Sequence, residues 1–64
     1  MIMVTRLNGT VVHLNAELIE SIESTPDTLI TLYTGKKLMV SESIDEVTFR
    51  VMRYRRQVSQ RVMG

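Results

Sequence analysis

The stretch from Ile22 to Val40 limits the fold of this chain most, because its residues indicate three consecutive strands joined by tight turns. Pro26 and Asp27 stand at the second and third positions of a four-residue segment that suits a type I turn. Gly35 marks the second turn, where a left-handed bulge residue follows a type I turn. Between the turns, residues 28–34 are only Thr, Leu, Ile and Tyr, which favour a packed, pleated surface. The stretch therefore predicts a β-rich domain.

Two further strands are predicted at the start of the chain. Asn8-Gly9 separates two β-rich segments and is typical of a type I′ hairpin turn, in which both residues have positive φ. Asn15 is placed to cap one helical turn before the next strand. The five predicted antiparallel strands cover about residues 2–7, 10–14, 19–24, 28–34 and 37–40. Their short connections predict a meander.

Apolar residues occupy both faces of these strands. Ile30 and Leu32 alternate with Leu29 and Tyr33, whereas a sheet with one solvated face usually shows cleaner alternation. We therefore expect a twisted sheet or a partly closed barrel. Both of its faces should be covered, by the chain itself or by a partner subunit.

The last third of the chain predicts an amphipathic helix over residues 43–63. Ser43 and Glu46 have the spacing of a capping box, and neither Pro nor Gly occurs again before Gly64. The apolar side chains form a main stripe, at Ile44, Val47, Val51, Tyr54, Val58 and Val62, and a second flank, at Phe49, Met52 and Met63. Such a helix is about 30 Å long, longer than a strand of five or six residues. Its last turns should overhang the sheet and leave Tyr54 and the residues after it without a partner in the chain.

A single α+β domain of residues 1–64 is expected, with the meander at 1–40 and the helix at 43–63. A chain of this length buries only about 60% of its unfolded surface, so its core is marginal. Disulfides and thiolate metal sites are excluded because there is no Cys, and His13 is the only His. Oligomerisation is the remaining way to bury more apolar surface, and we expect a homo-oligomer.

Charge is divided along the chain. Residues 1–47 carry three basic and seven acidic side chains, net −4, whereas residues 48–64 carry five arginines and no acid, net +5. An acidic body with a basic tail can attract copies of itself, anionic lipid or nucleic acid. The alternative is a solvated helix face, with Arg favoured near a helix C-terminus.

No catalytic or cofactor motif is present in the sequence. His13 is expected to be an edge-strand side chain rather than a general base, and the serines have no Gly-x-Ser-x-Gly elbow around them. Gly9 and Gly35 are isolated turn glycines, not a phosphate-binding loop. We expect a protein that is not an enzyme and has no cofactor, metal or small-molecule substrate. With no signal-peptide core and no membrane-spanning run, a cytoplasmic location is expected.

Several motifs in this order resemble the FlbD/SwrD family of small flagellar and swarming-motility proteins. They are Val4-Thr5-Arg6-Leu7-Asn8-Gly9, Asn15, Leu18-Ile19-Glu20-Ser21-Ile22-Glu23, Thr25-Pro26-Asp27-Thr28 and Gly35-Lys36-Lys37. The resemblance covers about residues 1–50. It implies a cytoplasmic, non-catalytic protein at the periphery of the flagellar motor, whose role in the swarming branch is to raise motor power through the stators.

The predicted contact residues fall into three groups. An oligomer or partner interface is expected at Tyr54, Val58, Val62, Phe49 and Met52; further partner contacts at Arg6, Glu20, Arg50, Arg53 and Arg56; and turn-forming roles at Asn8, Gly9, Pro26, Asp27 and Gly35. The arginines leave an alternative open, since they suit a phosphate-contacting face. The order of elements also resembles, loosely, the LytTR-type DNA-binding domain, which implies a nucleic-acid-binding regulator of flagellar genes.

Overall fold

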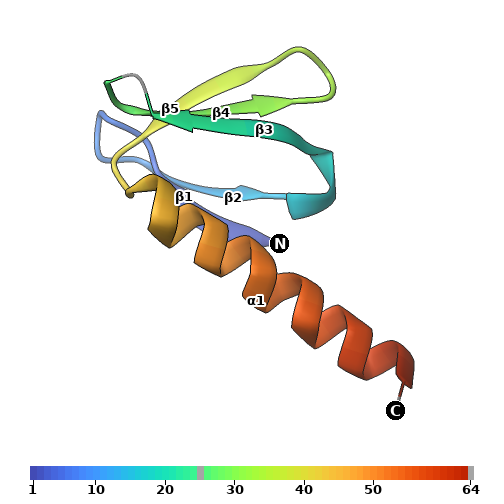
Figure 1. The fold of residues 1–64 in the computed structure, drawn as a ribbon. Coiled ribbons are helices and arrows are strands. Elements are labelled where there is room, and N and C mark those ends of the chain that lie inside the picture. Colours follow the sequence, from blue (N-terminus) through green and yellow to red (C-terminus); the bar gives the residue numbers. More distant parts are fainter. Residues whose placement is uncertain (25, 64) are drawn as a thin grey trace.

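Short strands and one long helix build the fold, as the computed structural model in Figure 1 shows. Its backbone is described for residues 1–24 and 26–63, and its side chains for residues 1–24 and 26–58. The elements in order are β1 (Ile2–Thr5), β2 (Val11–Leu14), the 3-10 turn η1 (Ala16–Leu18), β3 (Ile19–Ser24), β4 (Thr28–Leu32), β5 (Lys37–Val40) and α1 (Ile44–Met63). All five strands and the helix predicted from the sequence are confirmed; β3 and β5 have the predicted bounds, and β1, β2 and β4 are shorter.

The strands form two antiparallel sheets, so the prediction of a single five-strand meander is wrong. One sheet is the β1–β2 hairpin, and the other has the order β3-β4-β5. η1 separates them: the Asn15 side chain accepts a 3.0 Å hydrogen bond from the Glu17 amide, and Ala16 is fully buried. The chain turns into a new direction at this cap, and β3 pairs with β4 but not with β2.

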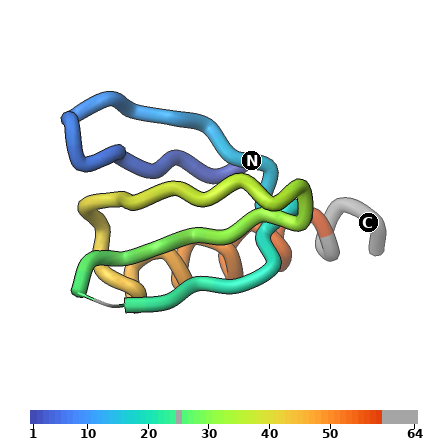
Figure 2. The backbone as a smooth tube through the Cα atoms, turned by 90° about the horizontal axis from the view of Figure 1, so that it is seen from above, coloured from blue at the N-terminus to red at the C-terminus, as the bar shows by residue number. Residues whose placement is uncertain are grey.

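The two sheets meet through β1 and β5. Arg6 and Val40 form an isolated antiparallel bridge, and the Ser41 amide donates a 2.8 Å hydrogen bond to the Thr5 carbonyl. Seen from above, β5 therefore lies between β1 and β4 (Figure 2). The described strands do not close into a barrel, so the alternative prediction of a partly closed barrel is wrong.

The turn between β1 and β2 and the turn between β4 and β5 have the same geometry. Gly9 and Gly35 have φ of 92° and 93°, and each amide bonds to the carbonyl three residues earlier, at Arg6 and at Leu32. This is a type I turn closed by a glycine bulge, as predicted at Gly35. The type I′ turn predicted at Asn8-Gly9 is wrong, because Asn8 does not have positive φ. The turn predicted around Pro26 and Asp27 includes Thr25, which lies outside the described residues.

The core lies between the β3-β4-β5 sheet on one side and the hairpin with α1 on the other (Figure 1). It consists of Ile2, Val4, Leu14, Ala16, Ile30, Leu32, Leu38, Val40, Val47 and Val51. On β4, Thr28, Ile30 and Leu32 are buried, while Leu29 and Thr31 are only partly so. The inner face of this sheet is therefore the core face. Met39, 41% exposed, lies on the outer face, which no described element covers.

α1 begins as the capping motif predicts. The Glu46 amide donates a 3.2 Å hydrogen bond to the Ser43 hydroxyl, and the Val47 amide bonds to the Ser43 carbonyl at 3.0 Å. Val47 is fully buried and Val51 nearly so, and both help to cover the core. Beyond them the helix extends past the strands (Figure 1), and the molecule measures 39 × 21 × 19 Å.

Candidate interaction surface

Arg50 fixes the rotation of α1 on the β1 strand. Its guanidinium donates a 2.6 Å hydrogen bond to the Met3 carbonyl and pairs with Glu42 at 3.3 Å and with Glu46 at 3.1 Å. Glu42 in turn accepts hydrogen bonds of 2.8 and 3.0 Å from the Thr5 amide. Because β1 pairs with β2 along its other edge, these side chains bond to main-chain groups on its free edge and hold the helix against it.

The Glu42 carboxylate remains ionised in this network. Burial raises its pKa, but the hydrogen bonds from Thr5 and the positive charge of Arg50 outweigh burial and hold the pKa below 4.5. A predicted partner contact, Arg50, is thus engaged within the chain as the clamp between helix and hairpin. Only one third of its side chain is exposed.

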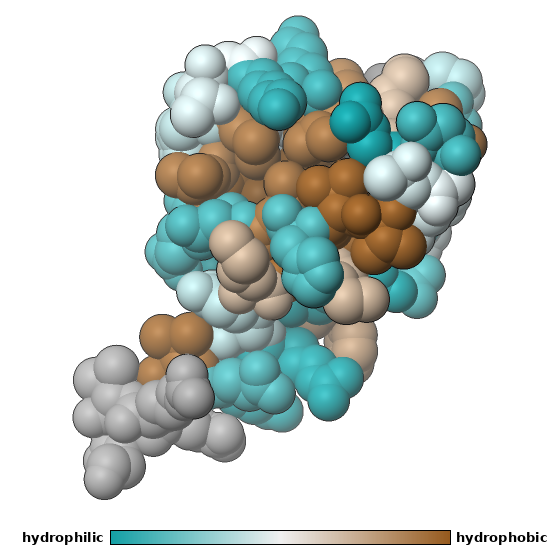
Figure 3. Space-filling view, turned by 180° about the vertical axis from the view of Figure 1, so that it is seen from behind, coloured by the Kyte–Doolittle hydropathy of each residue, from teal (hydrophilic) through white to brown (hydrophobic). Residues whose placement is uncertain are grey.

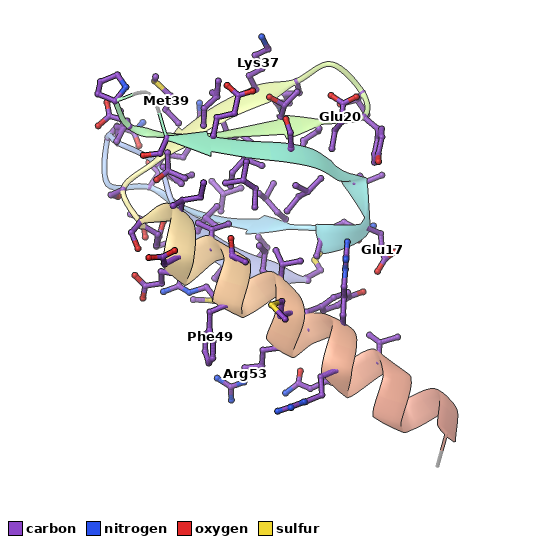
Figure 4. All side chains as sticks on the ribbon, viewed as in Figure 1. Glu17, Glu20, Lys37, Met39, Phe49 and Arg53 are labelled. Atoms are coloured by element: carbon purple, nitrogen blue, oxygen red, sulfur yellow. The ribbon has the colours of Figure 1, made fainter. Side chains whose placement is uncertain are left out.

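With α1 fixed in this way, its opposite side faces solvent. The groove on that side is lined by Phe49, Met52, Arg53, Arg56 and Gln57, here named the helix outer surface. Phe49 and Met52 are 63% and 66% exposed. Phe49 and Arg53 project away from the strands (Figure 4). Two large apolar side chains held this far out on a rigid helix are a candidate contact site.

The N-terminal residues extend this surface. A second groove is lined by Met1, Met3 and Tyr54, together with Arg50, Arg53 and Gln57, so it shares two residues with the helix outer surface. Met1 and Met3 are 68% and 51% exposed. Methionine is flexible and polarisable and is common where a protein surface adapts to a partner. The only sequence signal for this second groove was the strand alternation, which places Met1 and Met3 on the same side of β1.

Positive charge accompanies the exposed apolar groups. Arg53 and Arg56 are exposed, and neither forms an ion pair with any side chain that the structure describes. The described ion pairs both involve Arg50. The helix outer surface therefore combines apolar contact area with cationic groups that are free to meet carboxylates or phosphates.

The inner stripe of α1 does not leave Tyr54 unpartnered, contrary to expectation. Tyr54 is partly buried and packs against the core, because the N-terminal end of β1 reaches this far along the helix. Val58 is 37% exposed. Val62 and Met63 have side chains outside the described residues. The sequence pattern therefore overstated the apolar overhang by at least one residue.

Arg6 and Glu20 lie apart from the helix outer surface. Arg6 lines a small groove with Leu7, Asn8 and Met39 at the tip of the hairpin. Glu20 is exposed at the irregular register between Ile19 and Ser21, on the sheet side away from the helix (Figure 4). No described ion pair joins the two side chains.

A further apolar area lies on the strands. Figure 3 shows a band of hydrophobic side chains across the strand region, seen from the side opposite to that of Figure 1. The exposed apolar residues of the hairpin are Met1, Met3, Leu7 and Val11, the last 53% exposed. His13, paired with Met3 in the sheet, is also exposed.

The described part of the chain contains no group of three or more His, Cys, Asp or Glu side chains arranged to hold a metal ion. No described helix has both the length and the apolar character needed to cross a membrane.

The fold and this surface define a class: a small α+β protein with a long helix whose outer side offers exposed apolar and cationic groups for contact. The family model for FlbD, the flagellar and swarming motility proteins, matches residues 1–59. The chain therefore belongs to the FlbD family, as the sequence motifs indicated. Comparison with curated proteins and with solved structures gave no match.

Proposed function

We propose that this protein is a non-enzymatic accessory factor of flagellar motility that acts by binding proteins at the motor. Membership of the FlbD family supports a role in flagellar motility. Action by protein binding is supported above all by the exposure of Phe49 and Met52 beside Arg53 and Arg56. Contact sites often combine apolar anchors with arginine in this way. Its place is the cytoplasmic periphery of the motor, where it supports stator power or assembly.

Association of copies forms part of this proposal. The core of ten small or medium apolar residues is modest, and several larger apolar side chains stay exposed. Burying them against a second chain stabilises both. The surface proposed for this contact is centred on Phe49 and Met52; of the other residues predicted for the interface, Tyr54 packs against the core and Val62 lies outside the described side chains.

Swarming on agar tests the proposal directly. Deletion of the gene should abolish or slow swarming, and the wild-type gene should restore it. Phe49→Asp should fail to restore swarming although the protein accumulates normally. Tyr33→Asp is the matched control, because Tyr33 is 68% exposed at the end of β4, remote from α1. Normal swarming by the deletion strain would refute the motility role, and full rescue by Phe49→Asp would refute this contact surface.

A nucleic-acid-binding regulator of flagellar genes is the second candidate. It is favoured by the exposed Arg53, Arg55 and Arg56, which follow one another along the helix with no acidic residue after Glu46. The test is a mobility shift with DNA from flagellar promoters at low and moderate salt. A salt-dependent shift that is lost in Arg53→Ala/Arg56→Ala would support this function, and no binding at low salt would eliminate it.

A further inference from the structure

Four exposed residues form a regular stripe on the outer side of α1. Asp45, Phe49, Met52 and Arg56 follow one another at steps of four, three and four residues, the spacing of alternate core positions in a coiled coil. All four side chains are exposed. The stripe has an acid at its N-terminal end, two apolar residues in the middle and a base at its C-terminal end.

This pattern is complementary to itself when read backwards. If a second copy of the helix lies antiparallel along the stripe, Phe49 of each copy is level with Met52 of the other. Asp45 of each copy is then level with Arg56 of the other. Asp45 and Arg56 lie about 16 Å apart along one helix, so both charge pairs form at the same register. A parallel pair would place Asp45 beside Asp45 and Arg56 beside Arg56, which repel.

We propose that two copies of this protein pair antiparallel through this stripe, about a two-fold axis that passes between Phe49 and Met52. Such an interface is isologous, since the same patch serves both subunits. The proposal rests on the proposed function, because it names the partner of the helix outer surface as a second copy of the chain.

The surroundings of the stripe agree with this arrangement. Arg53 and Glu46 flank the stripe on the same side of the helix, and in the antiparallel pair Arg53 approaches Glu46 of the other copy. Neither Asp45 nor Arg56 has an ion-pair partner within the described part of the chain. Phe49 projects away from the strands, so a second helix meets it without displacing the sheet (Figure 4).

The contact between the two helices is short, so we expect the dimer to be weak. Residues 45 to 56 span about 18 Å of helix, so the buried area falls in the range of weak, transient interfaces. The pairing should therefore depend on protein concentration. It should also weaken with added salt, because its selectivity comes from exposed charges.

Sedimentation of charge variants tests the pairing. Wild-type protein should shift from monomer to dimer between about 10 µM and about 1 mM. Asp45→Arg and Arg56→Asp should each weaken dimerisation at least tenfold, because each creates two like-charge contacts. An equimolar mixture of the two should dimerise again, since both contacts become opposite-charge pairs. Lys37→Asp, which makes the charge change of Arg56→Asp at a position on β5, should dimerise like the wild type.

Cysteine cross-linking fixes the direction of the helices with milder substitutions. The chain has no cysteine. A mixture of Asp45→Cys and Arg56→Cys should form a disulfide between residues 45 and 56 under mild oxidation, and one Asp45–Arg56 pair stays intact in that dimer. Each variant alone should cross-link far more slowly, as should Tyr33→Cys.

Three results would overturn the proposal: a wild type that stays monomeric throughout, cross-links formed only between identical positions, and a monomer that binds anionic phospholipid vesicles without any cross-link. The last result would assign the stripe to a membrane surface. A swarming defect of Phe49→Asp in a monomeric protein would overturn the pairing and the association of copies, and would leave the proposed motility role standing, with a different protein as the partner.

Discussion

Arg50 and Met3 lie 47 residues apart in the chain and are joined by a 2.6 Å hydrogen bond from the guanidinium to the main-chain carbonyl. This bond, together with the ion pairs of Arg50, holds α1 in the orientation in which Val47 and Val51 are buried in the core. The opposite side, with Phe49 and Met52, is left in solvent as a consequence. The clamp within the molecule and the contact surface outside it are thus two sides of one helix.

Replacing Arg50 should destabilise the fold. Arg50→Ala leaves the Glu42 carboxylate without its cation and the Met3 carbonyl without this donor, which costs about 1 to 2 kcal/mol for a partly exposed side chain. The free energy of unfolding from urea titration, at one protein concentration, checks this. Arg55→Ala, at an exposed position of the same helix, should change it by less than about 0.5 kcal/mol. Equal effects of the two variants would mean that the clamp adds no stability.

Stability should fall in acid through Glu42. Burial raises the pKa of its carboxyl in the folded protein, but the hydrogen bonds from Thr5 and the charge of Arg50 outweigh burial and lower this pKa. The stabilisation is present above the unfolded pKa, and it is lost as pH drops through the lower, folded pKa. Glu42→Gln should therefore be less stable than the wild type at pH 7, and the difference should shrink as pH falls from 5 toward 3. Urea titrations at four or five pH values give both curves. A difference that is independent of pH would show that the charge of Glu42 is not what stabilises the fold.

The two bulge glycines should respond alike to substitution. Their φ values of 92° and 93° are unfavourable for L-residues, and no atom lies within 4 Å of a β-carbon added at either position. Backbone strain alone should cost about 1 to 2 kcal/mol in Gly9→Ala and in Gly35→Ala. Asparagine, which tolerates positive φ better, should cost less at both sites. Thermal unfolding of the four variants measures this, and an alanine that is harmless at one site would mean that its turn changes conformation.

Core packing should be sensitive at Ile30. It is fully buried at the centre of β4, opposite Ile22 and Leu38 on the neighbouring strands. Ile30→Val should cost about 1 kcal/mol, and Ile30→Ala about 2 to 5 kcal/mol, enough to unfold a small domain. Val11→Ala, at a site 53% exposed, should have little effect on the urea midpoint. A small effect of Ile30→Ala would mean that the core rearranges to fill the cavity.

Local signals predicted the elements well. Gly35 and the Ser43 cap act over two to four residues, and each stands at a boundary of an element found in the structure. The Asn8-Gly9 dipeptide placed the first turn correctly, although not its type. Pro26 and Asp27 lie between β3 and β4, as expected. The 3.6-residue period of α1 placed Val47 on the packed stripe, where it is buried; the alternation along β4 put Ile30 and Leu32 on one face without deciding that this face is the core face. Turns, caps and periodicity depend on covalent geometry and on side chains that are close in the sequence, so they can be predicted without the tertiary structure.

The order of residues alone indicates where the strands, turns and helix lie, and it contains the motifs that identify the family. Tertiary structure alone decided that β1 lies beside β5 instead of β2 beside β3, and that Tyr54 has a partner in the chain. It also decided that Arg50 is a clamp while Arg53 and Arg56 are exposed, although all three are arginines on one helix. The physical reason is that a side chain's role depends on contacts with residues tens of positions away, whereas turns and caps depend only on their neighbours.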